Sequence, residues 1–279
     1  MTFKLKQESP RQKISGIEPT IFWRIAEDIP RSLSWVMMAF SILIPLLCWF
    51  LVASYSGMDS VFLPSPSNVI EALFRLGNKG FLTKDIVASF TRVTIGFLLS
   101  ALVGVPIGIM MGSFASIRSL FEPIVGIIRY MPAPAFIPLL IIYLGIDEAP
   151  KIALIFIGTL FFNILMTMDA VKFIPKDLIE TTYTLGGSRW QVLSQVITPY
   201  IVPSILDAFR INIAASWNLV VVAELVAASE GLGKRILLAQ KFLKTDEIFA
   251  CLIILGLIGF ALDLSFRLLV RLSCKWAFN

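Results

Sequence analysis

Six stretches of this chain stay apolar for roughly twenty residues each. A helix needs about 20 predominantly apolar residues to cross a membrane, because it rises about 1.5 Å per residue through a hydrocarbon layer of about 30 Å. The stretches run over residues 35–55, 90–111, 124–146, 152–168, 208–228 and 248–270. Their residues do not alternate between apolar and polar, whereas strands of a membrane barrel do. We therefore predict an all-α membrane protein with six transmembrane helices.

Residue types that are missing exclude several kinds of chemistry. The chain has no histidine, which excludes a Ser-His-Asp triad and a histidine proton relay. The phosphate-binding loop G-x-x-x-x-G-K-[ST] is also absent, since the glycines at 231 and 233 before Lys234 have the wrong spacing. The three cysteines lack the spacing of a zinc site. We expect no catalytic residue, no metal and no cofactor in this chain, and we expect that it does not bind ATP itself.

The positive charges predict an orientation in the membrane, because cytoplasmic segments near span ends hold the excess of lysine and arginine. The basic residues that define this side are Lys4, Lys6, Arg11, Lys13, Arg24, Arg31, Arg118, Lys172, Lys176, Arg189, Arg267, Arg271 and Lys275. This arrangement places both termini in the cytoplasm. The loop 229–247 fits it imperfectly, because its four basic residues would then lie outside. The net charge of +5 reflects this asymmetry, so we expect no nucleic-acid partner.

The spans divide the chain into three predicted parts. Residues 1–33 form a cytoplasmic tail, residues 34–83 hold the first transmembrane helix and an external helix at the membrane interface, and residues 84–273 form the core. The interfacial helix follows the sequence FLPSPSNVIEAL, in which Ser67 is expected to cap the helix. The core contains a long polar segment, residues 169–207, which we call the coupling loop.

The coupling loop is predicted to form two short helices joined by a tight turn. Asp177 and Glu180 have the spacing of a capping box for the first helix. Gly186 and Gly187 allow the chain to leave that helix, and Ser188 with the glutamine three residues later repeats the capping pattern. The second helix carries Trp190 on an apolar surface, and Thr198-Pro199 is expected to end it. Such a pair could dock in a groove on a partner or lie on lipid headgroups.

The sequence ETTYTLGGSRWQVLSQVITP in this loop resembles the motif E-A-A, three residues, G, nine residues, I-x-L-P. That motif marks permease subunits of binding-protein-dependent ABC importers. Glu180, Gly186 and Pro199 match the motif, whereas Thr181 and Thr182 replace its two alanines. Val196 and Thr198 replace its isoleucine and leucine without changing the spacing. The similarity extends over residues 84–271.

The resemblance implies a type I ABC importer transmembrane domain in a bacterial inner membrane, with the loop as a cytoplasmic coupling helix pair. It also implies several partners: two ATP-binding cassette subunits that use ATP and Mg²⁺, an external substrate-binding protein, and a second permease copy in a homodimer or with a close relative. The chain would then be a transport subunit and not an enzyme. The residues implied in coupling are Glu180, Thr181, Thr182, Gly186, Gly187, Trp190 and Pro199.

Two further stretches, FLPSPSNVIEAL and IIRYMPAPAFIPLLIIYLGI, resemble the branch that imports nitrate, sulfonates, taurine and bicarbonate. The coupling loop, the proline-rich bend and the stretch WNLVVVAELVAASEGLG together look most similar to nitrate permeases. The resemblance therefore favours nitrate, with nitrite, as the cargo, and bicarbonate or an alkyl sulfonate as the alternative.

The third apolar stretch carries the first candidates for a translocation path. Pro132, Pro134 and Pro138 each remove a backbone donor, and a span tolerates this where neighbouring groups or a water-filled cavity satisfy the freed carbonyls. Arg129 lies just before this bend, where it could attract an anion through charge-assisted hydrogen bonds. The alternatives are that it pairs with a carbonyl or carboxylate to fix the bend, or that it reaches the cytoplasmic surface.

Glu224 is the other charged residue in an apolar stretch, with Asn212, Trp217 and Asn218 on partly the same helix face. A negative charge would oppose the entry of an anion. We therefore predict a gate or a structural ion pair with an arginine such as Arg92, in preference to direct binding of the cargo.

Two functions of other classes compete with an importer subunit. A stand-alone channel or ion-coupled carrier would need a pore of its own, coupling-ion ligands or an inverted repeat, and the sequence contains no clear repeat. A scaffolding membrane protein would leave the ordered coupling loop without a role. Copurification of an ATPase distinguishes the importer from both.

Overall fold

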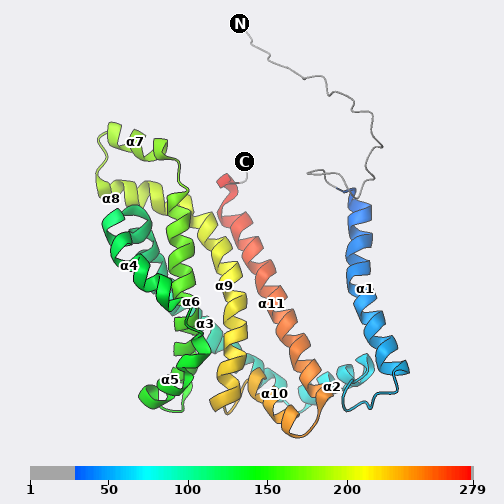
Figure 1. Ribbon diagram of the computed structural model, residues 1–279. Helices are drawn as coiled ribbons and strands as arrows, with labels where there is room; N and C mark the ends of the chain where they lie inside the picture. The colour runs from blue at the N-terminus through cyan, green and yellow to red at the C-terminus, as the bar shows by residue number, and fades with distance from the viewer. Residues whose placement is uncertain (1–28, 278–279) are drawn as a thin grey trace. The chain divides into compact units, whose positions relative to one another are not determined.

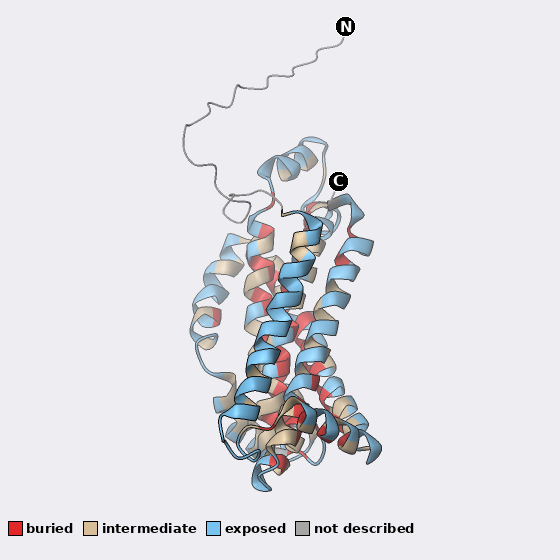
Figure 2. Cartoon of the chain, turned by 90° about the vertical axis from the view of Figure 1, so that its right-hand side faces the viewer, coloured by how far each residue is buried: buried red, intermediate tan, exposed pale blue. Residues whose placement is uncertain are grey.

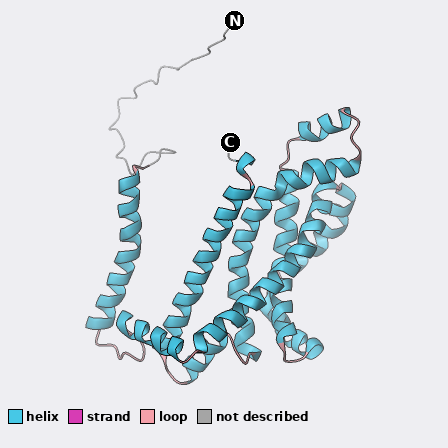
Figure 3. Cartoon of the chain, turned by 180° about the vertical axis from the view of Figure 1, so that it is seen from behind, coloured by secondary structure: helices cyan, strands magenta, loops and turns pink. Residues whose placement is uncertain are grey.

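The computed structural model describes residues 29–277, and this part of the chain consists of helices and loops without strands (Figure 3). The helices are α1 (Arg31–Tyr55), α2 (Pro66–Asn78), α3 (Phe81–Ser113), α4 (Ala115–Ile128), η2 (Ala133–Phe136), α5 (Ile137–Leu144), α6 (Glu148–Lys172), α7 (Lys176–Thr184), α8 (Arg189–Gln191), η3 (Val192–Ile197), α9 (Thr198–Ala227), α10 (Leu232–Lys241), α11 (Thr245–Ser273) and η4 (Lys275–Ala277). The prediction of an all-α chain is confirmed for these residues.

The chain divides into two compact units, one ending at Ser56 and the other beginning at Gly57. The described part of the first unit is essentially α1, which buries none of its residues. A helix that is apolar on all sides and buries none of its residues suits a lipid environment. The predicted cytoplasmic tail 1–33 lies almost wholly outside the described residues. All other helices belong to the second unit.

Five helices are long and apolar enough to span a membrane: α1, α3, α6, α11, and the continuous helix of α8, η3 and α9. The third predicted span, 124–146, is not a continuous helix. It is split into α4 and the pair η2–α5, which meet at an angle of 84°. The physical cause is the run of prolines at this point, since Pro132 immediately precedes η2 and each proline lacks the N–H that continues a helix. The predicted number of six spans therefore requires this bent pair to cross as one broken span.

The second unit places its shorter helices at two opposite ends of the spans. In Figure 1, α7 and α8 lie at the upper end, whereas α2, α10 and α5 lie at the lower end. In α2 the cap differs from the prediction, because the side chain of Ser65 and not that of Ser67 accepts the hydrogen bond from the N–H of Asn68. Pro66 then occupies the first turn, where its missing N–H costs nothing.

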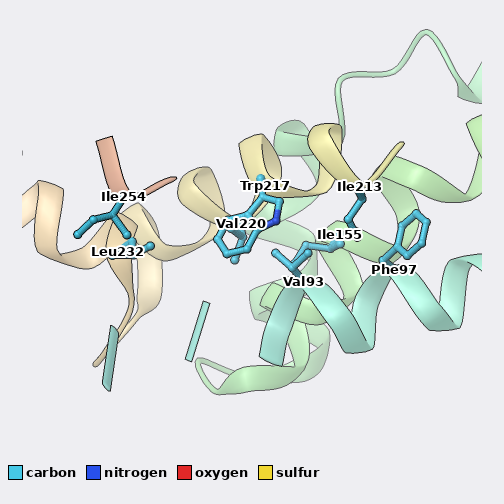
Figure 4. Packing of buried hydrophobic residues seen from close by; sticks show 8 residues of the cluster. All are labelled: Val93, Phe97, Ile155, Ile213, Trp217, Val220, Leu232 and Ile254. Carbon is cyan, nitrogen blue, oxygen red and sulfur yellow. The ribbon is translucent and has the colours of Figure 1, made fainter. Parts of the chain in front are cut away.

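The core of the second unit lies between α3, α6 and α9. Figure 2 shows buried residues on the inward sides of the spans and exposed ones outside, as expected where lipid covers the outer faces. A cluster around Val93, Phe97, Ile155 and Trp217 joins the three helices (Figure 4). Phe97 also meets the ring of Phe209 edge to face, with 5.3 Å between centroids.

Small residues allow α3 to lie directly against α6. A Cβ atom on Gly96 or Gly104 would come within 3.0 Å of Ile155 or Asn163, and one on Gly108 would lie 2.6 Å from the carbonyl oxygen of Ile164. Gly112 contacts Val171 in the same way. These glycines therefore serve close packing of α3 against α6.

We expect Gly108→Ala to destabilise the protein by about 1–3 kcal/mol, because the added methyl group meets backbone and cannot be relieved by a rotamer change. The matched control is Gly259→Ala in α11, where a Cβ atom would meet nothing within 4 Å. Alanine favours a helix over glycine by about 0.5–1 kcal/mol, so the control should be neutral or stabilising. Thermal unfolding of both variants in detergent measures the difference. Equal midpoints would show that α3 and α6 can move apart freely.

Candidate functional site

A pocket of about 340 Å³ lies beside the broken span, between the end of α4, η2, α6 and α9. We call it the bend pocket. Three of the residues predicted to line a translocation path, Arg129, Pro132 and Asn218, lie in its wall. The rest of the wall is mainly apolar and includes Phe136 and Phe161. The pocket thus brings together residues from four helices that lie up to about ninety positions apart in the sequence.

Arg129 supplies the positive charge of the bend pocket. It follows α4 directly, is exposed, and its Nη2 donates a hydrogen bond of 2.9 Å to the hydroxyl of Tyr130. Its guanidinium group also lies over the Tyr130 ring, 4.8 Å from the centroid. Neither a carboxylate nor a backbone carbonyl is recorded as its partner within the described residues. The guanidinium is therefore held in place yet keeps donors for an anion.

Asn218 and Gly158 also line the bend pocket, Asn218 with a polar side chain and Gly158 with none. Asn218 is exposed, and its Nδ2 donates to the carbonyl of Ala214 on the preceding turn. Gly158 lets α6 lie close to Leu219, because a Cβ atom at position 158 would overlap the Leu219 side chain. Pro134 belongs to η2 but is not part of the pocket wall, whereas Pro132 is.

Asn212 and Trp217, which were also predicted for the path, are buried away from the bend pocket. Asn212 donates a hydrogen bond of 2.6 Å to Asn163, which in turn donates one of 2.8 Å to Ser100. This chain of amides joins α9, α6 and α3 inside the bundle. Trp217 is 6% exposed and packs in the cluster of Figure 4, where its Nε1 has no hydrogen-bond partner among the described residues. In the structure these two side chains serve packing between spans.

Glu224 lies at the centre of a buried polar network and is fully enclosed. Its carboxylate accepts a hydrogen bond of 2.6 Å from Arg92, one of 2.7 Å from the hydroxyl of Ser89, and one of 2.8 Å from the backbone N–H of Gly233. The predicted ion pair between Glu224 and Arg92 is therefore present. A buried carboxylate requires such partners, because leaving it unpaired costs several kcal/mol.

Arg92 joins this network to the start of α6. Its Nε and Nη2 donate to the carboxylate of Glu148 at 2.5 and 2.8 Å, and its Nη1 also reaches the carbonyl of Glu230. Lys151 forms a second ion pair with Glu148 at 2.8 Å. The arginine thus ties α3, α6 and the segment after α9 together.

The sequence reasoning missed Asp85 and Ser89, although the spacing of 85, 89 and 92 places all three on one face of α3. Asp85 accepts a hydrogen bond from the N–H of Gly231 and pairs with Arg235 at 2.7 Å. The glycines at 231 and 233 are explained by the same network, because a Cβ atom at either position would overlap Glu224. The glycine pair that resembles a phosphate loop therefore lets the backbone approach a carboxylate.

A separate ion cluster lies at the same end of the unit, between α2 and α11. Arg75 pairs with Asp246 at 2.6 Å and with Glu247 at 3.3 Å. The hydrogen bond to Asp246 raises the pKa of the Arg75 guanidinium above its usual value. This pairing braces α2 against the start of α11.

The coupling loop contains the predicted helix pair, with two differences at the helix ends. Ser188 and Gln191 form the predicted capping box, in which the N–H of Ser188 donates to the Gln191 side chain at 2.7 Å. The prediction of a capping box by Asp177 and Glu180 is wrong. The N-cap of α7 is Pro175, and Asp177 lies inside the first turn of the helix. An acidic residue there still favours the positive end of the helix.

Pro199 does not end the second helix, contrary to the prediction. The chain continues from α8 through the π-helical turn η3 into α9, with Pro199 in the first turn of α9. The wide turn accounts for this, because the N–H of Thr198 bonds to the carbonyl of Leu193, five residues back, and the hydroxyl of Thr198 bonds to the same oxygen at 2.7 Å. A proline is tolerated at the start of a helix, where its missing N–H has no partner to lose.

The motif residues of the coupling loop are mostly at the surface. Glu180, Thr181, Gly186 and Trp190 are exposed, and Gly186 has the left-handed φ of +83° that the turn requires. Thr182 and Gly187 are half-buried because they contact each other, and a Cβ atom at Gly187 would lie 2.8 Å from the carbonyl oxygen of Thr182. The loop is therefore a rigid turn and not a linker.

Two large apolar side chains project from this turn. Leu185 is 83% exposed and Trp190 is 73% exposed, whereas Val192 and Leu193 on the other side of the second helix are buried. A fixed exposed pair of this kind is typical of a docking surface. Within the described residues, no group of acidic, cysteine or histidine side chains has the arrangement of a metal site.

The chain matches known transport proteins along most of its length. Residues 104–276, more than half of the chain, match the family model of the binding-protein-dependent transport system inner membrane component. The taurine transport system permease protein of Escherichia coli is 36% identical over 82% of this chain and 85% of its own length. The nitrate import permease protein of a Synechocystis species is 31% identical over 81% of this chain and 84% of its own.

A solved structure of the MetNI methionine ABC transporter in an inward-facing conformation gives a TM-score of 0.62 over 68% of this chain and 95% of the matched chain. Its sequence identity of 20% supports the fold alone, which is that of a type I ABC importer transmembrane domain. Both named relatives are permease subunits, in agreement with a transport subunit that is not an enzyme. The chain belongs to the family of multi-pass inner-membrane permease components of binding-protein-dependent transport systems.

Proposed function

We propose that this permease imports a small oxyanion into a bacterial cytoplasm and that the bend pocket is part of its path. The observation that carries the proposal is the position of Arg129, the one charged side chain among the described residues in the wall of a pocket formed by four helices. An anion passing through an apolar span needs a fixed positive group, and an arginine offers bidentate hydrogen bonds to an oxyanion.

Among the oxyanions we favour an alkyl sulfonate such as taurine over nitrate, which the sequence motifs favoured. Aromatic and aliphatic side chains form most of the pocket wall. This wall offers contacts to a short carbon chain, whereas nitrate has no apolar part to use them. The higher identity to the taurine permease than to the nitrate permease points the same way.

The ATP hydrolysis that drives import belongs to partner subunits in this proposal. Two ATP-binding cassette subunits hold ATP and Mg²⁺, an external binding protein delivers the anion, and two permease copies enclose the path as a homodimer or with a close relative. The coupling loop docks in the ATPase through the exposed side chains of Leu185 and Trp190. The permease itself holds no cofactor.

The charge distribution supports a cytoplasmic position for the coupling loop and both termini. Two of the four basic residues in the loop 229–247, which fitted the orientation imperfectly in sequence, are paired with carboxylates: Arg235 with Asp85 and Lys244 with Glu247. At the end that holds the coupling loop, Lys176 and Arg189 have no ion pair among the described residues. Their unpaired positive charge is consistent with a cytoplasmic position for that end.

The test of function is ATP hydrolysis by the permease reconstituted with its ATPase and binding protein, measured with taurine, nitrate and bicarbonate in turn. We expect stimulation by the sulfonate. Stimulation by nitrate alone would retain the importer and replace the cargo. If no ATPase copurifies, a channel, carrier or scaffold would be favoured instead.

We expect Arg129→Gln to reduce anion-stimulated uptake at least about tenfold, because a charge-assisted hydrogen bond contributes about 1.5–3 kcal/mol. Arg267→Gln is the matched control, since Arg267 is also exposed and pairs only within its own helix with Asp263. Uptake into vesicles at equal permease abundance measures both variants. Unchanged transport by Arg129→Gln would remove this residue from the path.

A further inference from the structure

A second pocket, of about 280 Å³, lies where α3 and α6 end beside the coupling loop. We call it the basic pocket. Its wall is formed by the last residues of α3, the start of α4, the end of α6, α7 and the turn η3. It is distinct from the bend pocket and shares no residue with it.

Among the described residues, four positive side chains and no carboxylate line the basic pocket. The four are Arg118, Lys172, Lys176 and Arg189. Arg118 is partly committed to the fold, because it donates to the carbonyls of Met111 and Gly112 in the last turn of α3. Lys172 pairs with Asp169 at 3.5 Å. Lys176 and Arg189 have neither an ion pair nor a side-chain hydrogen bond within the described residues, so their charge is available to a ligand.

The remaining wall is amphiphilic. Apolar side chains, among them Phe114, Ile174 and Ile179, form one part of it. The hydroxyl of Ser113 lies in the same wall, and its oxygen is buried without a hydrogen-bond partner in the described structure. A buried hydroxyl without a partner is uncommon, since most such groups are satisfied. A ligand that brings both an anionic oxygen and an apolar part would satisfy the whole wall.

We propose that the basic pocket binds the phosphate headgroup of an acidic phospholipid, such as phosphatidylglycerol. Basic pockets between transmembrane helices bind acidic headgroups, and this one lies where two spans end. The carboxylates close in sequence to the wall, Asp169 and Asp177, are not among its lining residues, and Asp169 already pairs with Lys172. The bound lipid would join the ends of α3 and α6 to the coupling loop, so that coupling depends on the lipid composition.

The test is native mass spectrometry of the assembled transporter in mixed phosphatidylglycerol and phosphatidylethanolamine. The double variant Lys176→Gln/Arg189→Gln removes the two unpaired charges. We expect it to retain phosphatidylglycerol about twenty-five-fold less tightly, since each cation contributes about fivefold. The charge-matched control is Arg271→Gln/Lys275→Gln, which removes two exposed cations outside the pocket. Counting lipid per assembled complex keeps an assembly defect from resembling a loss of lipid.

A second variant tests the pocket without changing charge. Ile179→Trp places a larger side chain in the wall and should displace phosphatidylglycerol while leaving the four cations in place. The proposal is overturned if wild type shows no preference for phosphatidylglycerol, or if the control pair loses it equally. It is also overturned if soluble glycerol phosphate binds as tightly as the lipid, because the ligand would then be a free phosphate. None of these outcomes depends on which anion is transported.

Discussion

Replacing Arg92 by methionine is expected to destabilise this permease by roughly 3–5 kcal/mol, because it leaves a fully buried carboxylate without its positive partner. Glu224 is 0% exposed, and Arg92 donates to it at 2.6 Å. The same change removes both hydrogen bonds to Glu148 and the one to the carbonyl of Glu230. Ser89 and the N–H of Gly233 would remain as partners, but neither carries a charge.

The matched control is Arg267→Met, which breaks an exposed pair four residues apart on α11. Such pairs contribute only about 0.3–0.5 kcal/mol. Thermal unfolding in detergent, followed by the amount of monodisperse protein, measures both variants. We expect a large fall in the unfolding midpoint for Arg92→Met and almost no change for the control. Similar midpoints would show that the network does not support the fold.

The double variant Arg92→Met/Glu224→Met distinguishes the contribution of the ion pair from the cost of leaving one buried charge unpaired. Removing both charges should recover part of the stability, since apolar residues can replace a buried pair at little cost.

The variant Glu224→Gln tests the predicted role of Glu224 as a gate. Reduced transport at unchanged membrane abundance would support a gate, and equal loss of abundance would assign Glu224 to the fold alone.

The second large effect is expected for Trp190→Ala, which should weaken binding of the ATPase subunits by about thirtyfold or more. Buried aromatic anchors at interfaces commonly contribute 2 kcal/mol or more, about thirtyfold in affinity. Trp190 is 73% exposed in the isolated chain, so its removal takes away little that the fold uses. The capping box of Ser188 and Gln191 holds the backbone of this position in place.

Trp276→Ala is the control for this variant, because Trp276 is also exposed and lies in η4, outside the coupling loop. Copurification of the ATPase and substrate-stimulated ATP hydrolysis are the two measurements. Trp190→Ala should lose ATPase copurification and substrate-stimulated ATP hydrolysis, while its unfolding temperature stays at the wild-type value. If it retains both, the coupling loop does not dock through this tryptophan, and the lipid surface becomes the better assignment for it.

Local chemistry made much of the fold predictable. Each span is identifiable because a twenty-residue apolar segment has few other stable states, and the Ser188 capping box needs only three neighbouring residues to form. The left-handed turn at Gly186 is local in the same way. The failed prediction at Pro199 also has a local cause, because the π-helical turn before it leads directly into α9 and places the proline in the first turn of that helix.

The candidate path shows where sequence reasoning stopped. Asn212 and Asn218 lie six residues apart on α9, so at about 100° per residue they point in directions about 120° apart. Asn212 is buried against Asn163, and Asn218 faces the bend pocket. Only the positions of α3 and α6 decide which of the two asparagines is buried. The ion pair of Arg92 and Glu224 was predictable because an isolated charge inside a span requires a partner.

The sequence by itself determined the membrane class, the helical spans, the coupling-loop motif and the family, because these depend on apolar length and on spacing along the chain. The tertiary structure alone decided the 84° break, the bend pocket beside Arg129, the close contact of α3 with α6, and the basic pocket. The physical reason is that these features join residues far apart in sequence. The neighbours of a helix face exist only once the spans have packed.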